Sequence, residues 1–199
     1  MKILITEPYK KSGGVYTFCE NIIPFLNNNE IEVFKRGVKG NKSIKLSILF
    51  DQIMDYFRYL KKLLENKYDL IFINTSLSKW NCLRDGIYII ISKLFNNNVL
   101  LFIHGFNEKC LKNKILMQGY FCSDNIIVLS REFKIKIKNT GYKKNIYISF
   151  NPVNKEISNY FTTNIIEERR LKKPSNILFL ARIEEEKGIM IALKAFEIL

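Results

Sequence analysis

The chain has 199 residues, of which 47% are hydrophobic and 26% are charged, with only 9 glycines and 4 prolines. This composition excludes a disordered chain, a collagen-like repeat and a linker protein. The 32 Lys and Arg against 19 Asp and Glu give a net charge of +13. This charge would be explained by binding to a nucleic acid, to an anionic membrane or to a phosphorylated small molecule, or by a coding bias towards Lys, Ile and Asn.

Short β-branched runs alternate along the chain with longer segments of helical size. The expected strands are Lys2–Thr6, Ile31–Lys35, Asp69–Asn74, Val99–His104, Asn125–Ser130, Asn145–Phe150 and Asn176–Leu180. The expected helices are Gly14–Asn27, Ser47–Asn66, Trp80–Phe95, Leu111–Phe121, Arg131–Asn139 and a last one that runs into Leu199. The run interiors are apolar without alternation, which is typical of strands buried on both faces of a parallel sheet. The sequence therefore predicts an α/β fold with a doubly wound, mostly parallel, Rossmann-like sheet.

One segment has an ambiguous pattern. Between Phe133 and Lys138 apolar residues alternate with lysines at a period of two, as in a strand. The segment nevertheless follows Ser130, a favourable helix N-cap, and places Glu132 in the first turn. A strand here would also follow the preceding strand without a turn between them. We therefore predict a helix.

A change of composition near Asn151 and Pro152 predicts a domain boundary. Residues 1–151 would form a whole Rossmann-like domain, and the polar segment 152–174 would be an interdomain linker. Residues 175–199 would then be the first βα unit of a second, truncated Rossmann-like domain. The helix of that unit would expose apolar residues such as Ile191 and Phe196, which predicts a partner surface.

Targeting and metal signals are absent from the sequence. No apolar run has the length that a spanning helix or a signal peptide requires, which predicts a cytoplasmic protein. Segment Lys35–Lys67 carries nine Lys and Arg against three Asp and Glu, a charge that would attract the protein to the inner face of the cell membrane. His104 is the single histidine and the cysteines form no C-x-x-C pair, so no metal site is expected.

Three groups of residues at expected strand ends suit ligand binding, because ligands of open parallel sheets bind beyond these ends. Gly13 and Gly14 stand before a helix, where the backbone approaches an anion such as a diphosphate. His104 ends a buried strand and suits a hydrogen bond to a substrate hydroxyl. Arg182 and Lys187 flank a turn before a helix, as in a phosphate clamp. A plain loop turn, a structural histidine and a solvated charged turn are the respective alternatives.

The order of these features along the chain resembles that in the family-4 retaining glycosyltransferases of the GT-B fold. The most specific match is Ile177–Gly188, which reads Ile-Leu-Phe-Leu-Ala-Arg-Ile-Glu-Glu-Glu-Lys-Gly. Looser matches are the Gly13-Gly14 turn and the stretch from Ser123 to Asn154. Such enzymes have two Rossmann-like domains that face a cleft, and they transfer a sugar from a nucleotide-sugar donor to an acceptor without a metal.

The resemblance implies roles for the strand-end residues. Arg182 and Lys187 would hold the donor diphosphate. Gly13 and Gly14 would approach it across the cleft, and His104 would contact the donor sugar. No cofactor is implied, and the acceptor would be a cell-surface glycan or its lipid-linked precursor, in polysaccharide biosynthesis. The family's glutamate pair would lie beyond the last residue, so no catalytic residue is identified and the isolated chain is expected to show little or no transferase activity.

Two other functions fit parts of the sequence. A non-catalytic truncated paralogue, or a subunit whose partner chain supplies the missing donor domain, would carry the same motifs. Nucleic-acid binding would use the basic charge, but the sequence has no helix-turn-helix, zinc or RNA-binding signature. The 15 Phe and 10 Tyr lie mostly in apolar runs, where they are expected to pack in the core.

Overall fold

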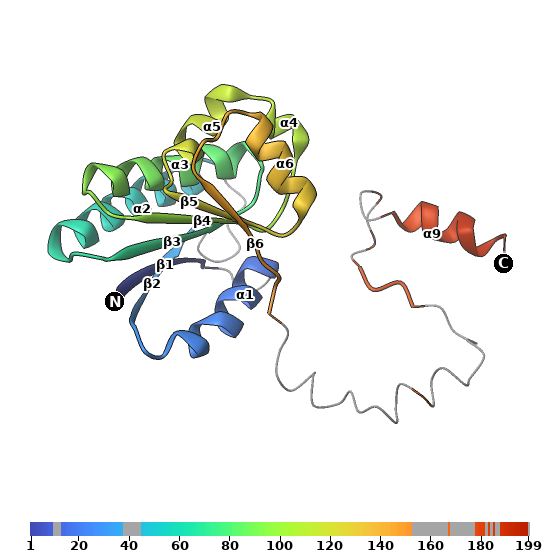
Figure 1. Cartoon of the computed structure of the whole chain (residues 1–199), viewed down its shortest axis with the longest axis horizontal. Helices are drawn as coiled ribbons and strands as arrows, with labels where there is room; N and C mark the ends of the chain where they lie inside the picture. Colours follow the sequence, from blue (N-terminus) through green and yellow to red (C-terminus); the bar gives the residue numbers. More distant parts are fainter. Residues whose placement is uncertain are drawn as a thin grey trace. The chain divides into compact units, whose positions relative to one another are not determined.

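A computed structural model describes residues 1–9, 13–37, 45–152, 167, 178–181, 183, 185 and 188–198. They belong to two compact units, Met1–Val153 and Asn154–Leu199. The described residues of the first unit form a six-stranded, all-parallel sheet in the order β2-β1-β3-β4-β5-β6 (Figure 1). The fold class expected from the sequence, a Rossmann-like α/β domain, is confirmed.

The strands lie where the apolar runs predict them, with ends shifted by one or two residues. They are β1 Lys2–Pro8, β2 Glu30–Arg36, β3 Leu70–Thr75, β4 Val99–Ile103, β5 Asn125–Val128 and β6 Asn145–Ile148. The helices of this unit are α1 Gly14–Ile22, α2 Lys45–Glu65, α3 Lys79–Leu94, α4 Glu108–Leu111, α5 Lys114–Phe121 and α6 Arg131–Asn139, with a 3-10 turn η1 over Ile23–Leu26.

Two expected helices have different bounds in the structure. The one predicted over Gly14–Asn27 stops being α-helical after Ile22, because Pro24 has no N–H to donate, and it continues as η1. The one predicted over Leu111–Phe121 begins only at Lys114, as α5, because the Asn113 side chain caps it by accepting a hydrogen bond from the Leu116 N–H, and the short α4 before it was not predicted. The ambiguous segment is helical as predicted: it forms α6, and Ser130 Oγ accepts from the Phe133 N–H.

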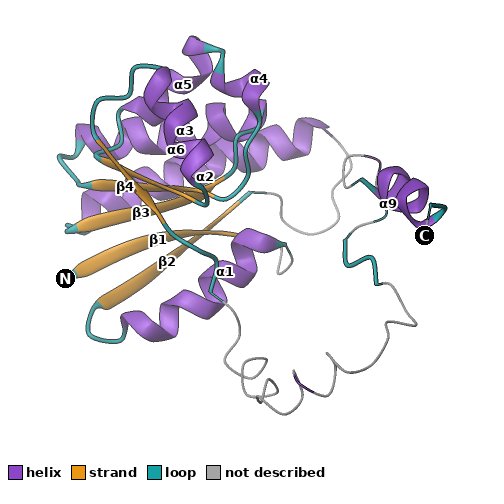
Figure 2. Cartoon of the chain, turned by 45° about the vertical axis from the view of Figure 1, so that its right-hand side comes forward, coloured by secondary structure: helices purple, strands orange, loops and turns teal. Residues whose placement is uncertain are grey.

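The sheet is covered on both faces (Figure 2). Alternate strand residues face two separate cores. The larger core packs α2, α3, α5 and α6 against Leu4, Ile73 and Leu101, and the smaller packs α1 against Ile5 and Phe102. Crossovers on both sides of one sheet define the doubly wound arrangement.

Helices α3 and α5 pack closely at a pair of glycines. A Cβ added to Gly119 would lie 2.5 Å from the Gly86 Cα, and one added to Gly86 would lie 3.3 Å from the Gly119 Cα. Each glycine therefore makes room for the backbone of the other helix, and the contact fixes α3 over the sheet.

In the second unit the structure describes helix α9, Ile189–Phe196, on which Ile191 and Phe196 are exposed as expected. Of the strand expected over Asn176–Leu180, residues 178–180 form no strand, because a strand needs a neighbour and the described part of this unit contains none. The linker boundaries 152–174 and the unit 175–199 stay predictions. No helix in the described ranges has both the length and the apolar character needed to cross a bilayer.

Candidate functional site

The strand order places a switch point between β1 and β3, because β2 lies on the far side of β1. In open α/β sheets, ligands bind at this point beyond the carboxyl ends of the strands. A pocket of about 260 Å³ lies there. Its wall combines strand ends with the starts of α1 and α3: Pro8, Gly13, Gly14, Val15, Arg36, Asn74, Thr75, Ser76, Asn81 and Arg84.

The glycine turn predicted from the sequence forms one side of this pocket. Gly13 is the N-cap of α1 with φ of +97°, a backbone conformation that favours glycine, and no side chain caps the helix. A Cβ at Gly13 or Gly14 would meet no atom within 4 Å. The start of α1 is therefore both uncapped by a side chain and unobstructed, which are the conditions for an anion to approach its N–H groups.

His104 follows β4 and lies next to the pocket rather than in its wall. The His104 ring packs against Phe18 and Phe102, with centroid distances of 4.7 and 4.0 Å. Its Nε2 lies 3.1 Å from Asn74 Oδ1, and its Nδ1 lies 3.3 Å from Asn151 Oδ1. Burial lowers the pKa of His104 to about 4, so the ring is neutral at pH 7.

The Asn74 amide determines which His104 nitrogen carries the proton. Asn74 Nδ2 donates to the Thr6 carbonyl oxygen at 3.2 Å, which turns Asn74 Oδ1 towards His104. A neutral imidazole has a single N–H, so Nε2–H donates to Asn74 Oδ1. His104 Nδ1 then carries no proton, so it does not donate to Asn151 Oδ1, and it can accept a hydrogen bond from a ligand hydroxyl.

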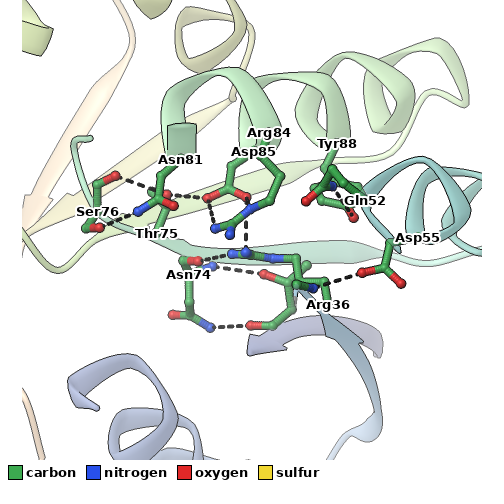
Figure 3. A network of polar contacts seen from close by, with 12 residues as sticks. Arg36, Gln52, Asp55, Asn74, Thr75, Ser76, Asn81, Arg84, Asp85 and Tyr88 are labelled. Carbon is green, nitrogen blue, oxygen red and sulfur yellow. Dashed lines mark hydrogen bonds and ion pairs between the residues drawn. The ribbon is translucent and has the colours of Figure 1, made fainter. Parts of the chain in front are cut away.

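The other side of the pocket holds a buried charge cluster that the sequence analysis missed (Figure 3). Arg36, the last residue of β2, has 2% side-chain exposure, and its Nη1 lies 3.2 Å from Asp85 Oδ1. Arg84 reaches both oxygens of the same carboxylate, with Nε at 2.7 Å and Nη2 at 3.0 Å. Arg36 Nη2 also donates to the Asn74 carbonyl oxygen.

Helix α3 contributes Arg84 and Asp85 to the cluster, and the residues at its start determine where these side chains lie. Ser78 caps the helix by accepting from the Asn81 N–H at 3.3 Å. Asn81, Arg84 and Asp85 then follow at i, i+3 and i+4, which places them on one helix face. The Asp85 carboxylate also accepts from Thr75 Oγ1. Burial raises the pKa of Asp85, but the two guanidinium groups outweigh it and hold that pKa below its ordinary value.

The structure thus brings together Gly13, Gly14 and, through Asn74, His104. Arg182 and Lys187 lie outside the described residues, and the roles of all five stay predictions. In the described part of the chain, no group of three His, Cys, Asp or Glu side chains is placed to hold a metal ion. One signal pointed to the missed cluster: Arg36 directly follows an expected strand, as His104 ends one.

Comparison with known proteins gives similarity to solved structures. No protein-family model and no curated protein matches the chain. Among solved structures, the chain is similar to the crystal structure of Anabaena HepE in complex with UDP and glucose, with a TM-score of 0.51 and 14% identity. The match covers 85% of this chain and 49% of HepE, so the chain spans about half of the length of HepE. At this identity the similarity concerns the fold: the chain has a glycosyltransferase-like α/β fold, and membership of family 4 stays a prediction.

Proposed function

We propose that this chain is the acceptor-side part of a glycosyltransferase that moves a sugar from a nucleotide-sugar to a glycan or lipid-linked acceptor. The supporting observation is the pocket at the switch point, where the uncapped start of α1 lies within reach of a diphosphate. The similar fold of HepE, which binds UDP and glucose, supports the choice of ligand. In the reaction, the bond between the sugar and the diphosphate breaks and the nucleoside diphosphate leaves with the electron pair. A bond from the sugar to the acceptor oxygen forms, and the proton of the acceptor hydroxyl passes to the departing diphosphate oxygen.

The proposal gives each predicted residue a task. Gly13 and Gly14 bring backbone N–H groups to the donor diphosphate, and His104 Nδ1 accepts a hydrogen bond from a donor-sugar hydroxyl. Arg182 and Lys187 neutralise the diphosphate. Neither a cofactor nor a metal takes part in the proposed transfer.

Substitution of Gly14 with Leu tests the donor site. The added side chain meets no protein atom at its Cβ, so the fold is expected to be kept while the side chain occupies the ligand's space. We expect the dissociation constant for UDP-glucose, from an NMR titration of backbone amide shifts, to rise at least tenfold.

The matched control is Thr17→Leu, which adds an apolar side chain on the exposed side of the same helix. Thr17→Leu should bind UDP-glucose as the unaltered chain does. Equal affinities of the Gly14 variant and the unaltered chain would refute the donor site. An unaltered chain that binds neither UDP nor UDP-glucose would favour the non-catalytic alternative.

Helix α2 supports a location at a membrane surface, because it turns apolar residues outward. Asp51 and Asp55 lie on its buried side. Its exposed apolar residues are Leu46, Leu49, Phe50, Ile53, Met54, Phe57 and Leu64. The exposed Lys61 extends this stripe, and the basic composition of the segment Lys35–Lys67 would add attraction to an anionic lipid surface. An apolar helix face with basic neighbours is suited to an anionic lipid surface.

The double variant Phe50→Gln/Phe57→Gln tests this docking surface without changing the charge. We expect at least tenfold weaker co-sedimentation with vesicles that contain phosphatidylserine, and weaker binding of the unaltered chain as salt is added. The control is Phe25→Gln, since Phe25 is 70% exposed on η1, on the opposite face of the sheet. The proposal would be contradicted if Phe25→Gln weakened co-sedimentation as much as the double variant does. Binding of the unaltered chain to neutral vesicles as strong as to anionic ones, or dimerisation of the chain through α2, would also contradict it.

A further inference from the structure

The pocket wall carries more positive than negative charge. Arg36 and Arg84 both line the pocket, and both pair with the single carboxylate of Asp85. Within the described residues neither guanidinium has a second acidic partner. The acidic Glu7 at the end of β1 pairs with Lys35, and alternation along the strands directs both of these side chains to the α1 face, away from Arg36. The Arg36–Asp85–Arg84 cluster therefore retains one uncompensated positive charge.

The same cluster contains an unused donor. Arg36 Nε is buried, and it has no hydrogen-bond partner in the part of the chain that the structure describes. Leaving a buried N–H without an acceptor costs about 1–3 kcal/mol, so such groups in native proteins call for an explanation. Because Arg36 also lines the pocket, an anion there would stabilise this guanidinium through its charge rather than through a direct contact with Nε.

Further donors surround this position. The wall includes Asn81 and Ser76, whose side chains are joined by a 2.6 Å hydrogen bond from Asn81 Nδ2 to Ser76 Oγ. Across the pocket is the start of α1, which the proposed function assigns to the donor diphosphate. The guanidinium groups and the Asn81 amide lie on the α3 side of the pocket, and they are complementary to a second oxyanion.

The size of the pocket restricts the ligand. At about 260 Å³ it is smaller than the roughly 300–1,000 Å³ sites that enclose drug-sized ligands. This volume has room for one acidic sugar residue but does not enclose a whole nucleotide-sugar, most of which would extend beyond the pocket. We propose that this pocket binds the acidic group, a carboxylate or a phosphate monoester, of an anionic acceptor sugar. The role of this sugar as the acceptor rests on the proposed function, whereas the binding of an anion in the pocket does not.

A titration of the full chain with three small probes tests the site. Glucuronate carries the carboxylate, glucose 6-phosphate carries the phosphate, and glucose has no charge. We expect at least one of the two acids to bind at least tenfold more tightly than glucose, with amide shifts in α3. The tighter of the two acids identifies the acidic group.

Two variants and one control connect the binding to the pocket. Arg84→Gln removes one guanidinium, and Asn81→Asp places a carboxylate in the wall at a helix N3 position where an acidic residue is favourable for folding. Each is expected to weaken binding of the acid at least tenfold. Lys79→Gln removes one positive charge from the exposed start of α3, outside the pocket wall, and should change the affinity less than twofold.

Three results would overturn the proposal: acids that bind no better than glucose, an Asn81→Asp variant with unchanged affinity, or a Lys79→Gln variant as weak as the others. A titration with UDP in the same samples separates this proposal from the proposed function. If the acids bind and UDP does not, the result counts against sugar transfer but not against the anion site. If UDP binds and the acids do not, the result counts against the anion site but not against sugar transfer. Displacement of the acids by UDP would assign the pocket to the donor diphosphate and refute the acceptor.

Discussion

Replacing Asp85 with Ala is expected to lower the free energy of unfolding by about 3–5 kcal/mol, the usual cost of removing one partner of a buried ion pair. The variant leaves Arg36 and Arg84 facing each other without the carboxylate that both contact. It also removes the acceptor of Thr75 Oγ1. Urea denaturation followed by circular dichroism at pH 7 measures the loss.

The control for Asp85 is an ion pair at the surface. Glu65 lies 3.6 Å from Lys61 on α2, and both side chains are more than half exposed, so Glu65→Ala should cost less than about 1 kcal/mol. If Asp85→Ala lowers the free energy of unfolding no more than Glu65→Ala does, the cluster is not a buried ion pair in solution. Because the folded-state pKa of Asp85 lies below the ordinary 3.8, its contribution is present above about pH 4 and is lost as the pH falls through the folded-state pKa.

Substitution of Gly119 with Ala is expected to lower the free energy of unfolding by about 1–2 kcal/mol, because overpacking of so tight a contact should lie at the upper end of the usual cost of about 1–3 kcal/mol. The new methyl group would lie 2.5 Å from the Gly86 Cα. That neighbour is backbone and is held in α3, so the two helices have to separate. The gain of about 1 kcal/mol in helix propensity from Gly to Ala offsets only part of the cost.

The reciprocal substitution serves as the matched comparison. A methyl group at Gly86 would lie 3.3 Å from the Gly119 Cα, a contact that a small shift relieves, so Gly86→Ala should stay within about 1 kcal/mol of the unaltered chain. Thermal unfolding of both variants gives the ranking, and a more damaging Gly86→Ala would contradict the geometry. Since α3 carries Arg84, we also expect Gly119→Ala to weaken anion binding in the pocket.

Much of the fold was predictable because its signals are local. Ser130 identified α6 as a helix even though the lysine alternation favoured a strand, since a capping hydroxyl acts within three residues. Asn113 carried the same kind of signal and was missed, because an apolar pattern continues on both sides of it. The helix boundary at Ile22 was likewise encoded by Pro24, whose missing N–H acts only on the preceding turn.

The candidate site was only partly predictable because its pairings span long distances in sequence. Gly13, Gly14 and His104 were predicted as ligand-binding residues because the two glycines stand between an expected strand and an expected helix and His104 ends an expected strand. Arg36 lies at such an end too, but it belongs to a basic segment in which a solvated charge is the ordinary expectation. Its partner Asp85 is adjacent to Arg84, which locally suggests a surface pair. Burial of this cluster results from the packing of α3 over β2 and β3, which no single segment encodes.

Asn74 has a consequence for the interpretation of mutational scans. Its carbonyl oxygen holds Arg36, its Oδ1 orients His104, and its Nδ2 ties β3 to the Thr6 carbonyl on β1. Because the side-chain contacts go through one amide, shortening this side chain releases the histidine and the β1–β3 link together. A mutational scan of activity would then show as large a loss at position 74 as at a residue that reacts, although Asn74 acts by positioning other residues of the site. A His104→Ala variant, compared with the variant at position 74, isolates the part of the effect that acts through the histidine.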